Sequence, residues 1–401
     1  MLQRIALTLI TIFIKYVKKL IKMTNLAFLC IADYFGVLKH CLELDYSMFH
    51  YPMHENALLN AHKARFNRLL GIYPENKYNN TFILNPVHKC SKEGVPNPQL
   101  IILVKSAINH FERRSAIRRT WGSENEYHGI VQTVFLLGSS NNKDIEKLVQ
   151  NENEEFNDIV KTNFFDSYDN NTIKTLMGLQ WAVDNCEQSS YFMFVDDDYF
   201  VSTKNVLLYL SNFFLNQNWP EKLNITEKNS PLNTRPERSG ARYSDFTQLS
   251  INTKKNQEYI KVELASNLKN SRNCLKLFAG FVIKSSPHRH KFSKWYIGLS
   301  EYPFDMWPPY VTAGAYILSR ESLTELFFMS MFTKIFKYDD IYLGILALKA
   351  NITVTHCSKF YFEKATYSGP NDYRYVIASH GYGNPKEMVK IWSQCRFAGY
   401  T

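Results

Sequence analysis

The run YFMFVDDDYFV, Tyr191 to Val201, decides the fold prediction because it places three consecutive aspartates between two apolar segments. The residues before them, Phe192 to Val195, are typical of a buried β-strand. Asp196, Asp197 and Asp198 therefore follow the C-terminal end of a strand, which is where open α/β sheets bind ligands. Carboxylate oxygens gathered there suit Mg²⁺ or Mn²⁺, which in turn bind a nucleotide diphosphate. The alternative is a solvated acidic turn, since runs of like charge usually lie on wet loops.

Strand and helix patterns alternate on the N-terminal side of this run. Buried strands are indicated by LIILVK from Leu100 and VQTVFLLG from Val131, and a helix start by FERRSAIRRTWG from Phe111. A polar, exposed helix follows the second strand, and Asn171 to Cys186 has apolar residues at helical spacing just before the aspartates. This alternation predicts an α/β fold with a parallel sheet flanked by helices.

The composition sets broad limits. With 401 residues and 45% hydrophobic content, the chain can bury the core of one large or two ordinary domains, which excludes disorder throughout. The formal net charge is +10, and Lys and Arg are scattered rather than gathered in one block. The charge therefore indicates only an anionic partner, such as nucleic acid, a membrane surface or a sugar nucleotide.

Cysteines and sequons bear on the compartment. None of the seven cysteines forms a CxxC pair, so neither a structural zinc site nor a thioredoxin-type motif is indicated, and disulfides stay open. Four Asn-x-Ser/Thr sequons favour the secretory pathway, although such tripeptides also arise by chance. The sequons begin at Asn79, Asn170, Asn224 and Asn351.

The N-terminal region has three interpretations. The apolar stretch Ile5 to Ile14 is shorter than the roughly 20 residues that cross a bilayer, and lysines follow it. Those lysines can flank a weak type II signal anchor within residues 1–38, with Met23 to Leu38 buried. A signal peptide and an amphipathic surface helix are the alternatives. Residues 39–96 resemble a stem without its own core. The polar stretch at about 216–273 is interpreted as a long loop.

Three further segments carry candidate chemistry. Arg114 and Arg118 lie one helical turn apart and can both meet nucleotide phosphates or ribose, unless they form an exposed basic helix face. WPPYVTAGAYILS, from Trp307, suits either a sugar-stacking wall or a packed core turn. In KYDDIYLG, Asp339 and Asp340 begin a helix, where one carboxylate caps the helix and the other is left to act as a base.

These segments resemble glycosyltransferase family 31, the inverting β1,3-galactosyl- and β1,3-N-acetylglucosaminyltransferases of the Golgi. The resemblance spans residues 97–401. It rests on RRSAIRRTWG, VFLLG, DSYDNNTIKTLMGLQW, FVDDDYFV, WPPYVTAGAYILS and DDIYLG in this order. Within the family the chain is similar to the Brainiac type of β1,3-N-acetylglucosaminyltransferase, through HKFSKWY, EYPFDMW and the C-terminal YVIASHGYGNPKEMVKIW.

The resemblance implies a single GT-A catalytic domain, with a Rossmann-like mixed sheet flanked by helices, behind a type II Golgi anchor. It implies transfer of N-acetylglucosamine from UDP-N-acetylglucosamine to mannose or galactose of a glycolipid or glycan, with Mn²⁺ or Mg²⁺ and without nucleic acid. A β1,3-galactosyltransferase using UDP-galactose and a non-catalytic scaffold of the same fold are the alternatives. A calcium-binding or lectin-like module is disfavoured, because the aspartate run lacks EF-hand spacing.

The resemblance also implies residue roles. Asp198 is the main metal carboxylate, assisted by Asp196, and Asp340 is the catalytic base. The remaining roles concern the donor pocket and a sugar wall. The donor pocket comprises Arg114, Ile117, Arg118, Asp166, Lys174, Asp196, Asp197 and Gly314, and the wall comprises Trp307 and Tyr310.

The chain departs from the family pattern at several positions. Asp339 stands where the family commonly has Glu, and Asn171 where it usually has Leu. A late His often completes the metal site. Here His356 is the expected ligand, with Glu363 as the alternative.

Overall fold

The computed structural model describes residues 2–51, 57–68, 70, 73–78, 81–91, 97–124, 127, 129–214 and 276–401. The expected polar loop at about 216–273 and the sequons at Asn79 and Asn224 lie outside these residues. The chain divides into two compact units. The larger comprises residues 52–283 and 310–401, and the smaller comprises residues 1–51 and 284–309.

A seven-stranded mixed sheet forms the centre of the larger unit, in the order β3-β2-β1-β4-β7-β6-β8. Strand β1 runs parallel to β2 and β4, whereas β7 runs antiparallel to β4 and β6. The mixed sheet expected from the sequence is therefore confirmed. The strands are β1 (Leu100–Lys105), β2 (Val131–Ser139), β3 (Ile159–Phe165), β4 (Tyr191–Asp196), β6 (Phe278–Ile283), β7 (Tyr310–Ser319) and β8 (Val354–His356).

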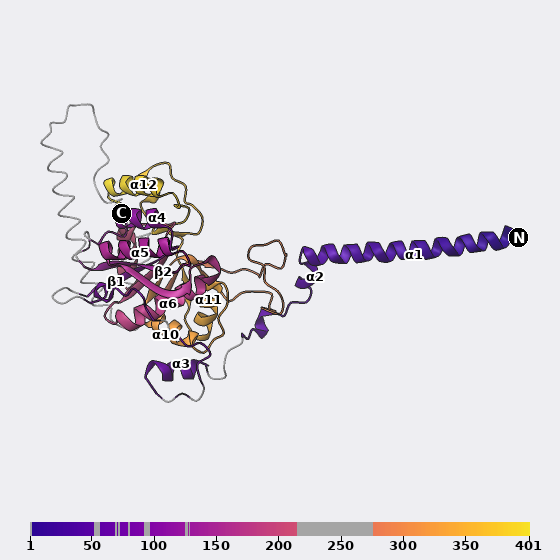
Figure 1. Cartoon of the computed structure of the whole chain (residues 1–401), viewed down its shortest axis with the longest axis horizontal. Helices are drawn as coiled ribbons and strands as arrows, with labels where there is room; N and C mark the ends of the chain where they lie inside the picture. Colours follow the sequence, from indigo (N-terminus) through magenta and orange to yellow (C-terminus); the bar gives the residue numbers. More distant parts are fainter. Residues whose placement is uncertain are drawn as a thin grey trace, which may run out of the picture. The chain divides into compact units, whose positions relative to one another are not determined.

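Helices cover both faces of this sheet (Figure 1). All six residues of β1 are buried, which explains why its sequence is a continuous apolar run rather than an alternating one. On one face, Ile102 and Val104 share a core with Ile117 and Trp392. That face is covered by α4 (Phe111–Arg118), α5 (Lys143–Phe156) and α12 (Pro385–Phe397). The other helices of the larger unit are α3 (Ala57–Arg65), α6 (Asn171–Asn185), α7 (Thr203–Phe214), α10 (Arg320–Ser330) and α11 (Asp339–Lys349).

A second, three-stranded sheet joins distant parts of the chain. Its order is β5 (Phe200–Val201), β10 (Ala378–Ser379), β9 (Phe360–Tyr361). Strands β5 and β10 are antiparallel and pair Ser379 with Phe200. This pairing places the residue after β10 beside the residues that precede β5.

Residues 57–91, within the range 39–96 expected to be a stem, belong to the larger unit. Arg65 on α3 donates two hydrogen bonds to the carboxylate of Glu321 on α10, at 2.5 and 2.7 Å. The side chain of Asn76 donates to the carbonyl oxygens of Ser330 and Thr333. Because these bonds join the segment to α10 and the turn that follows it, the described residues of 57–91 pack as part of the larger unit.

The smaller unit has a core of its own. Arg289 is buried and donates to the carboxylate of Glu43 and to the carbonyl oxygens of Ile297 and Phe304. The aromatic ring of Phe49 packs against Phe304, with ring centroids 5.2 Å apart. Its helices are α1 (Leu2–Tyr34) and α2 (Val37–His40). Across the described part of the chain, we find no helix that combines the length and apolar character needed to cross a membrane.

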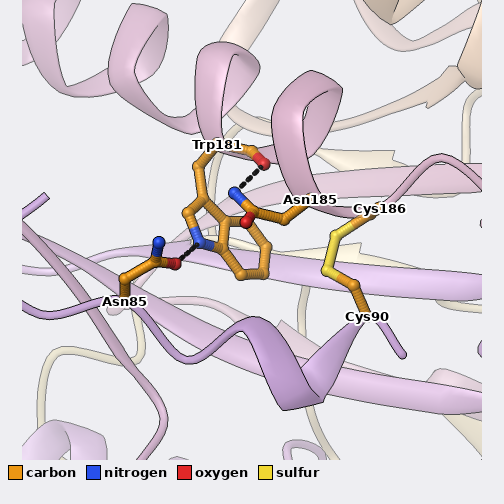
Figure 2. The surroundings of a disulfide bond; sticks show 5 residues. All are labelled: Asn85, Cys90, Trp181, Asn185 and Cys186. Atoms are coloured by element: carbon orange, nitrogen blue, oxygen red, sulfur yellow. Dashed lines mark hydrogen bonds between the residues drawn. A yellow bond between two sulfur atoms is a disulfide. The ribbon is translucent and has the colours of Figure 1, made fainter. Parts of the chain in front are cut away.

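A disulfide bond between Cys90 and Cys186 fastens the segment before β1 to the end of α6 (Figure 2). Beside it, the indole nitrogen of Trp181 donates to the side-chain oxygen of Asn85 at 2.8 Å. Asn185 donates to the carbonyl oxygen of Trp181 at 2.9 Å. The same lead-in segment is therefore held to α6 by a covalent link and by a buried tryptophan.

Replacing both Cys90 and Cys186 by Ser should lower the free energy of unfolding by about 3 kcal/mol, because the bond closes a long loop in the unfolded chain. The two cysteines are 96 residues apart. Urea unfolding followed by tryptophan fluorescence measures the change. Cys41→Ser, at an exposed free thiol, is the matched control. An unchanged midpoint in the double variant would contradict this role for the bond.

Candidate active site

The candidate site lies where β1, β4 and α11 meet at the C-terminal edge of the large sheet. Lys105, the last residue of β1, is buried, and its Nζ lies 3.0 Å from Asp196 Oδ1 and 3.0 Å from Asp339 Oδ2. The hydroxyl of Thr175 on α6 also donates to Asp339 Oδ2, at 2.8 Å. One ammonium group therefore joins the aspartate run to the start of α11.

Charge complementarity holds Lys105 in its ionised form. Burial alone would lower the pKa of Lys105, but the carboxylates of Asp196 and Asp339 outweigh burial and raise that pKa. Asp339 thus has a structural partner, and its side chain is only 9% exposed. The expected capping role is not seen for Asp339, whose carboxylate pairs with the side chains of Lys105 and Thr175 instead of a backbone N–H of α11.

Asp197 is held by three side chains from the segment that follows β1. Its carboxylate accepts from the Ser106 hydroxyl at 2.7 Å and from Arg113 at 2.8 Å, and lies 2.8 Å from His110 Nδ1. Burial would raise the pKa of Asp197, but the hydrogen bonds from His110 and Ser106 outweigh it and lower the pKa. Asp197 therefore fixes the β1–α4 loop and stays ionised, which agrees with a supporting role.

Asp198 faces a histidine from the end of the chain. His380 Nε2 lies 3.4 Å from Asp198 Oδ2, and the two side chains are 46% and 30% exposed. The hydrogen bond with Asp198 raises the pKa of His380. The second carboxylate oxygen, Asp198 Oδ1, is buried and has no hydrogen-bond partner among the described residues.

A divalent cation fits this pair, because carboxylate oxygen and imidazole nitrogen are both ligands for Mn²⁺ and one oxygen is left without a partner. Asp198 and His380 would hold the ion, with Asp196 beside them. In the described ranges, no group of three or more His, Cys, Asp or Glu side chains could hold a metal by itself. Such cations commonly take one or two protein ligands and complete their coordination with substrate phosphates and water.

The structure does not bring His356, the expected metal ligand, to the aspartates. His356 ends β8, and its Nδ1 accepts from the backbone N–H of Val282 at 3.1 Å. Strand β8 lies three strands from β4 in the sheet, which corresponds to about 14 Å. We therefore consider His380, and not His356, as the candidate late ligand of the metal. Glu363, the alternative ligand, is exposed, and no ion pair of its side chain is seen among the described residues.

Arg114 and Ile117, expected at the uridine, present no surface to a ligand here. The Arg114 side chain is 0% exposed and donates to Glu152 and to the carbonyl oxygens of Ala107 and Ile108. Ile117 is fully buried in the core. Arg118 pairs with Glu152 at 2.7 Å and with Asp158 at 2.8 Å. Glu152 and Asp158 therefore hold the two arginines, which fix the position of α4 and of the β1–α4 loop.

Lys174 and Asp166 come together as expected. Lys174 Nζ lies 3.0 Å from Asp166 Oδ1 and donates to the carbonyl oxygen of Ser106. Asp166 Oδ2 also accepts from the backbone N–H of Gly138 at 2.7 Å. Burial lowers the pKa of Lys174, and the charge of Asp166 opposes that change. The pair therefore joins the ends of β1 and β2 to α6, at the ligand-binding edge of the sheet.

Gly314 on β7 lies against the aspartate run. A Cβ at Gly314 would be 2.1 Å from the hydroxyl of Tyr199, so no larger residue fits while Tyr199 keeps this position. Trp307 and Tyr310, the expected sugar wall, are both buried, at 5% and 9% exposure. Trp307 packs within the smaller unit against Tyr302, with ring centroids 4.1 Å apart. Burial favours the packed-core interpretation of both residues.

Asp340 is the second residue of α11 and is partly exposed. Its Oδ1 accepts from the backbone N–H of Ile341 at 2.8 Å. Burial raises the pKa of Asp340, and the neighbouring charge of Asp339 raises it further. A carboxylate with a raised pKa is a better proton acceptor than an ordinary aspartate, which suits a general base.

Several polar residues of the site were missed in the sequence, among them Lys105, Ser106, His110 and His380. The first three lie at or shortly after a predicted strand end, so their position was available as a signal. The sequence held no such signal for His380, because the approach of this residue to Asp198 depends on the two-residue strands β5 and β10.

Comparison with known proteins agrees with this geometry. The model of the galactosyltransferase family matches residues 112–261 and 251–358. The Drosophila melanogaster protein named β-1,3-galactosyltransferase brn is 37% identical over 378 residues, 94% of this chain and 95% of that protein. Human UDP-GalNAc:β-1,3-N-acetylgalactosaminyltransferase 1 is 29% identical over 78% of this chain and 77% of its own length. The solved structure of the galactosyltransferase LgtC with donor and acceptor sugar analogues is 9% identical in sequence. The match covers 73% of this chain and 95% of the LgtC chain, with a TM-score of 0.32.

The sheet, the carboxylates at its C-terminal edge and these relatives define a hexosyltransferase. More narrowly, the chain belongs to the galactosyltransferase family, glycosyltransferase family 31. The resemblance to the Brainiac type is confirmed as well, although the relative that shows it is named a β-1,3-galactosyltransferase and not an N-acetylglucosaminyltransferase.

Lys105→Met should lower the free energy of unfolding by about 3 kcal/mol, because it leaves the buried Asp339 without its ionic partner. Chemical denaturation of the full chain measures this loss. Adding Asp339→Asn to Lys105→Met should recover part of it, since the uncompensated charge is then removed. If Lys105→Met unfolded at the wild-type midpoint, the bridge would have no role in stability.

His380→Ala should weaken Mn²⁺-dependent binding of UDP roughly tenfold or more, which is the scale on which even indirect metal contacts act. His356→Ala, the matched control, should leave that affinity unchanged. Isothermal titration of UDP with and without Mn²⁺ separates the two variants. The opposite ranking would return His356 to the metal site and remove His380 from it.

Proposed function

We propose that the protein catalyses inverting β1,3-transfer of a hexose from a UDP-sugar to a 3-hydroxyl of mannose or galactose on a glycolipid or glycan. One observation carries the proposal. The buried Lys105 joins Asp196, in the acidic run, to Asp339, the neighbour of Asp340. The carboxylates that suit a diphosphate-bound cation and the carboxylate that suits a base are therefore held in one network at the ligand-binding edge of the sheet.

Asp340 would accept the proton of the acceptor hydroxyl as its oxygen attacks the anomeric carbon. The bond from that carbon to the UDP oxygen breaks, the electron pair leaves with UDP, and the configuration inverts without a covalent enzyme intermediate. The raised pKa of Asp340 matches the proton-accepting step. A cation held at Asp198 and His380 would supply positive charge to the leaving diphosphate.

The donor sugar has two candidates. N-acetylglucosamine is the donor that the motif resemblance favours. Galactose is the second candidate, because the Drosophila relative is named a β-1,3-galactosyltransferase. The close contact between Tyr199 and Gly314 limits the space beside the aspartate run in either case.

We further propose a Golgi location, as a single-pass type II protein with the catalytic unit in the lumen. The Cys90–Cys186 disulfide supports an oxidising compartment, since such bonds are rare in reducing ones. The sequons and the lysine-flanked N-terminal segment are consistent with that orientation.

The full chain with Mn²⁺ should transfer sugar from UDP-N-acetylglucosamine to a β-mannoside or β-galactoside, and mass spectrometry with NMR should identify a β1,3 product. Transfer from UDP-galactose alone would establish the second candidate.

Asp340→Asn should reduce turnover by about 10²-fold or more while UDP-sugar affinity stays near wild type. Asp144→Asn, at an exposed carboxylate on α5 outside the Lys105 network, is the control and should keep wild-type turnover. If Asp340→Asn kept most of its activity, another group would have to be the base.

A further inference from the structure

Two sequons that are equivalent in sequence lie in different surroundings in the structure. Asn170-Asn171-Thr172 and Asn351-Ile352-Thr353 are the sequons within the described residues. Both offer an asparagine amide and a hydroxyl two residues later, which is the pattern that N-glycosylation requires. Their surroundings differ at both of these groups.

Asn351 lies in the turn that ends α11. Its φ is 51°, the left-handed conformation that glycine and asparagine adopt most readily after a helix. The backbone N–H of Ile352 closes the turn on the carbonyl oxygen of Ala347 at 2.8 Å. Ile352 is buried, whereas Asn351 and Thr353 on either side of it are exposed. The turn therefore presents the amide and the hydroxyl to solvent together.

Asn170 is partly exposed at the start of α6, but both groups of its sequon are already engaged. Its side-chain nitrogen already donates to the carbonyl oxygen of Phe165 at 2.8 Å. Thr172 is 2% exposed, and its hydroxyl donates to the carbonyl oxygen of Phe336 at 2.9 Å. Both groups of this sequon serve the fold, and the hydroxyl is out of reach of a glycosylating enzyme once the chain has folded.

The Asn351 turn is also well placed for a large substituent. It leads directly into β8, which pairs only with β6 in the described part of the sheet and lies at the end of the strand order. An exposed strand edge can pair with other chains, and a bulky polar group nearby would obstruct that pairing. Strands β8 and β4 run in the same direction, because β4 and β6 are both antiparallel to β7 and β8 is parallel to β6. Asn351 precedes β8 and the acidic run ends β4, so the two lie at opposite edges of the sheet.

We infer that Asn351 carries an N-linked glycan and that Asn170 remains unmodified. The inference rests on the luminal location proposed above. Asn351 Nδ2 forms a bond to the anomeric carbon of a lipid-diphosphate-linked oligosaccharide and loses one proton to a base. The bond from that carbon to the phosphate oxygen breaks, and the lipid diphosphate leaves with the electron pair.

The test uses the full chain, expressed in a eukaryotic secretory cell with an acceptor sequon added after Thr401 to report luminal exposure. Enzymatic deglycosylation in ¹⁸O water followed by peptide mass spectrometry should find labelled aspartate at position 351 and unlabelled asparagine at position 170. Thr353→Ala should lose one glycan by gel mobility, and Thr353→Ser, which keeps the sequon, should retain it. Both variants leave the Asn351 turn residue in place.

The possible failures are distinguishable. A glycosylated C-terminal reporter with unmodified Asn351 would overturn the inference and leave the luminal location intact. An unmodified reporter together with unmodified Asn351 would overturn both. A labelled aspartate at position 170 would refute the distinction between the two sequons. None of these results depends on transferase activity, so they do not bear on the donor or the base.

Discussion

The Lys105 ammonium is the interaction on which the candidate site depends. A buried cation requires anionic partners, and here they come from β4 and from α11, two elements far apart in sequence. Because Lys105 is also the last residue of the central strand β1, its backbone position is fixed by hydrogen bonding to the strands on either side. The rigid sheet thus sets the distance between the acidic run and the start of α11.

The three consecutive aspartates have three different environments. Asp196 is paired with Lys105, Asp197 is enclosed by Ser106, His110 and Arg113, and Asp198 faces His380. Three adjacent carboxylates would otherwise repel one another, and each is stabilised by a separate positive or hydrogen-bonding group. Of the three aspartates, only Asp198 has a buried oxygen without a hydrogen-bond partner among the described residues. That oxygen is the one that would bind a cation.

The sequence predicted the parts of the fold that depend on local pattern. The apolar run of β1 and the helical spacing of α6 led to the correct elements, and the aspartates lie at a strand end as expected. Prediction failed where the outcome depended on a distant partner. The burial of Arg114 follows from Glu152 on α5, and basic residues on a helix do not reveal whether a carboxylate will cover them. His380 was not considered beside His356 and Glu363, because strands of two residues leave no periodic signal. The packing of residues 57–91 was missed for a similar reason, since it rests on individual side-chain bonds to α10.

The small sheet of β5, β9 and β10 has a consequence for biosynthesis. His380 directly follows β10, late in the order of elements, whereas its partner Asp198 lies just after β4. The central strands and Asp340 can all leave the ribosome before the imidazole that completes the proposed cation site. A nascent or truncated chain would therefore have the large sheet without that ligand. The proposed cation site can therefore form only after β10 has been synthesised and has paired with β5.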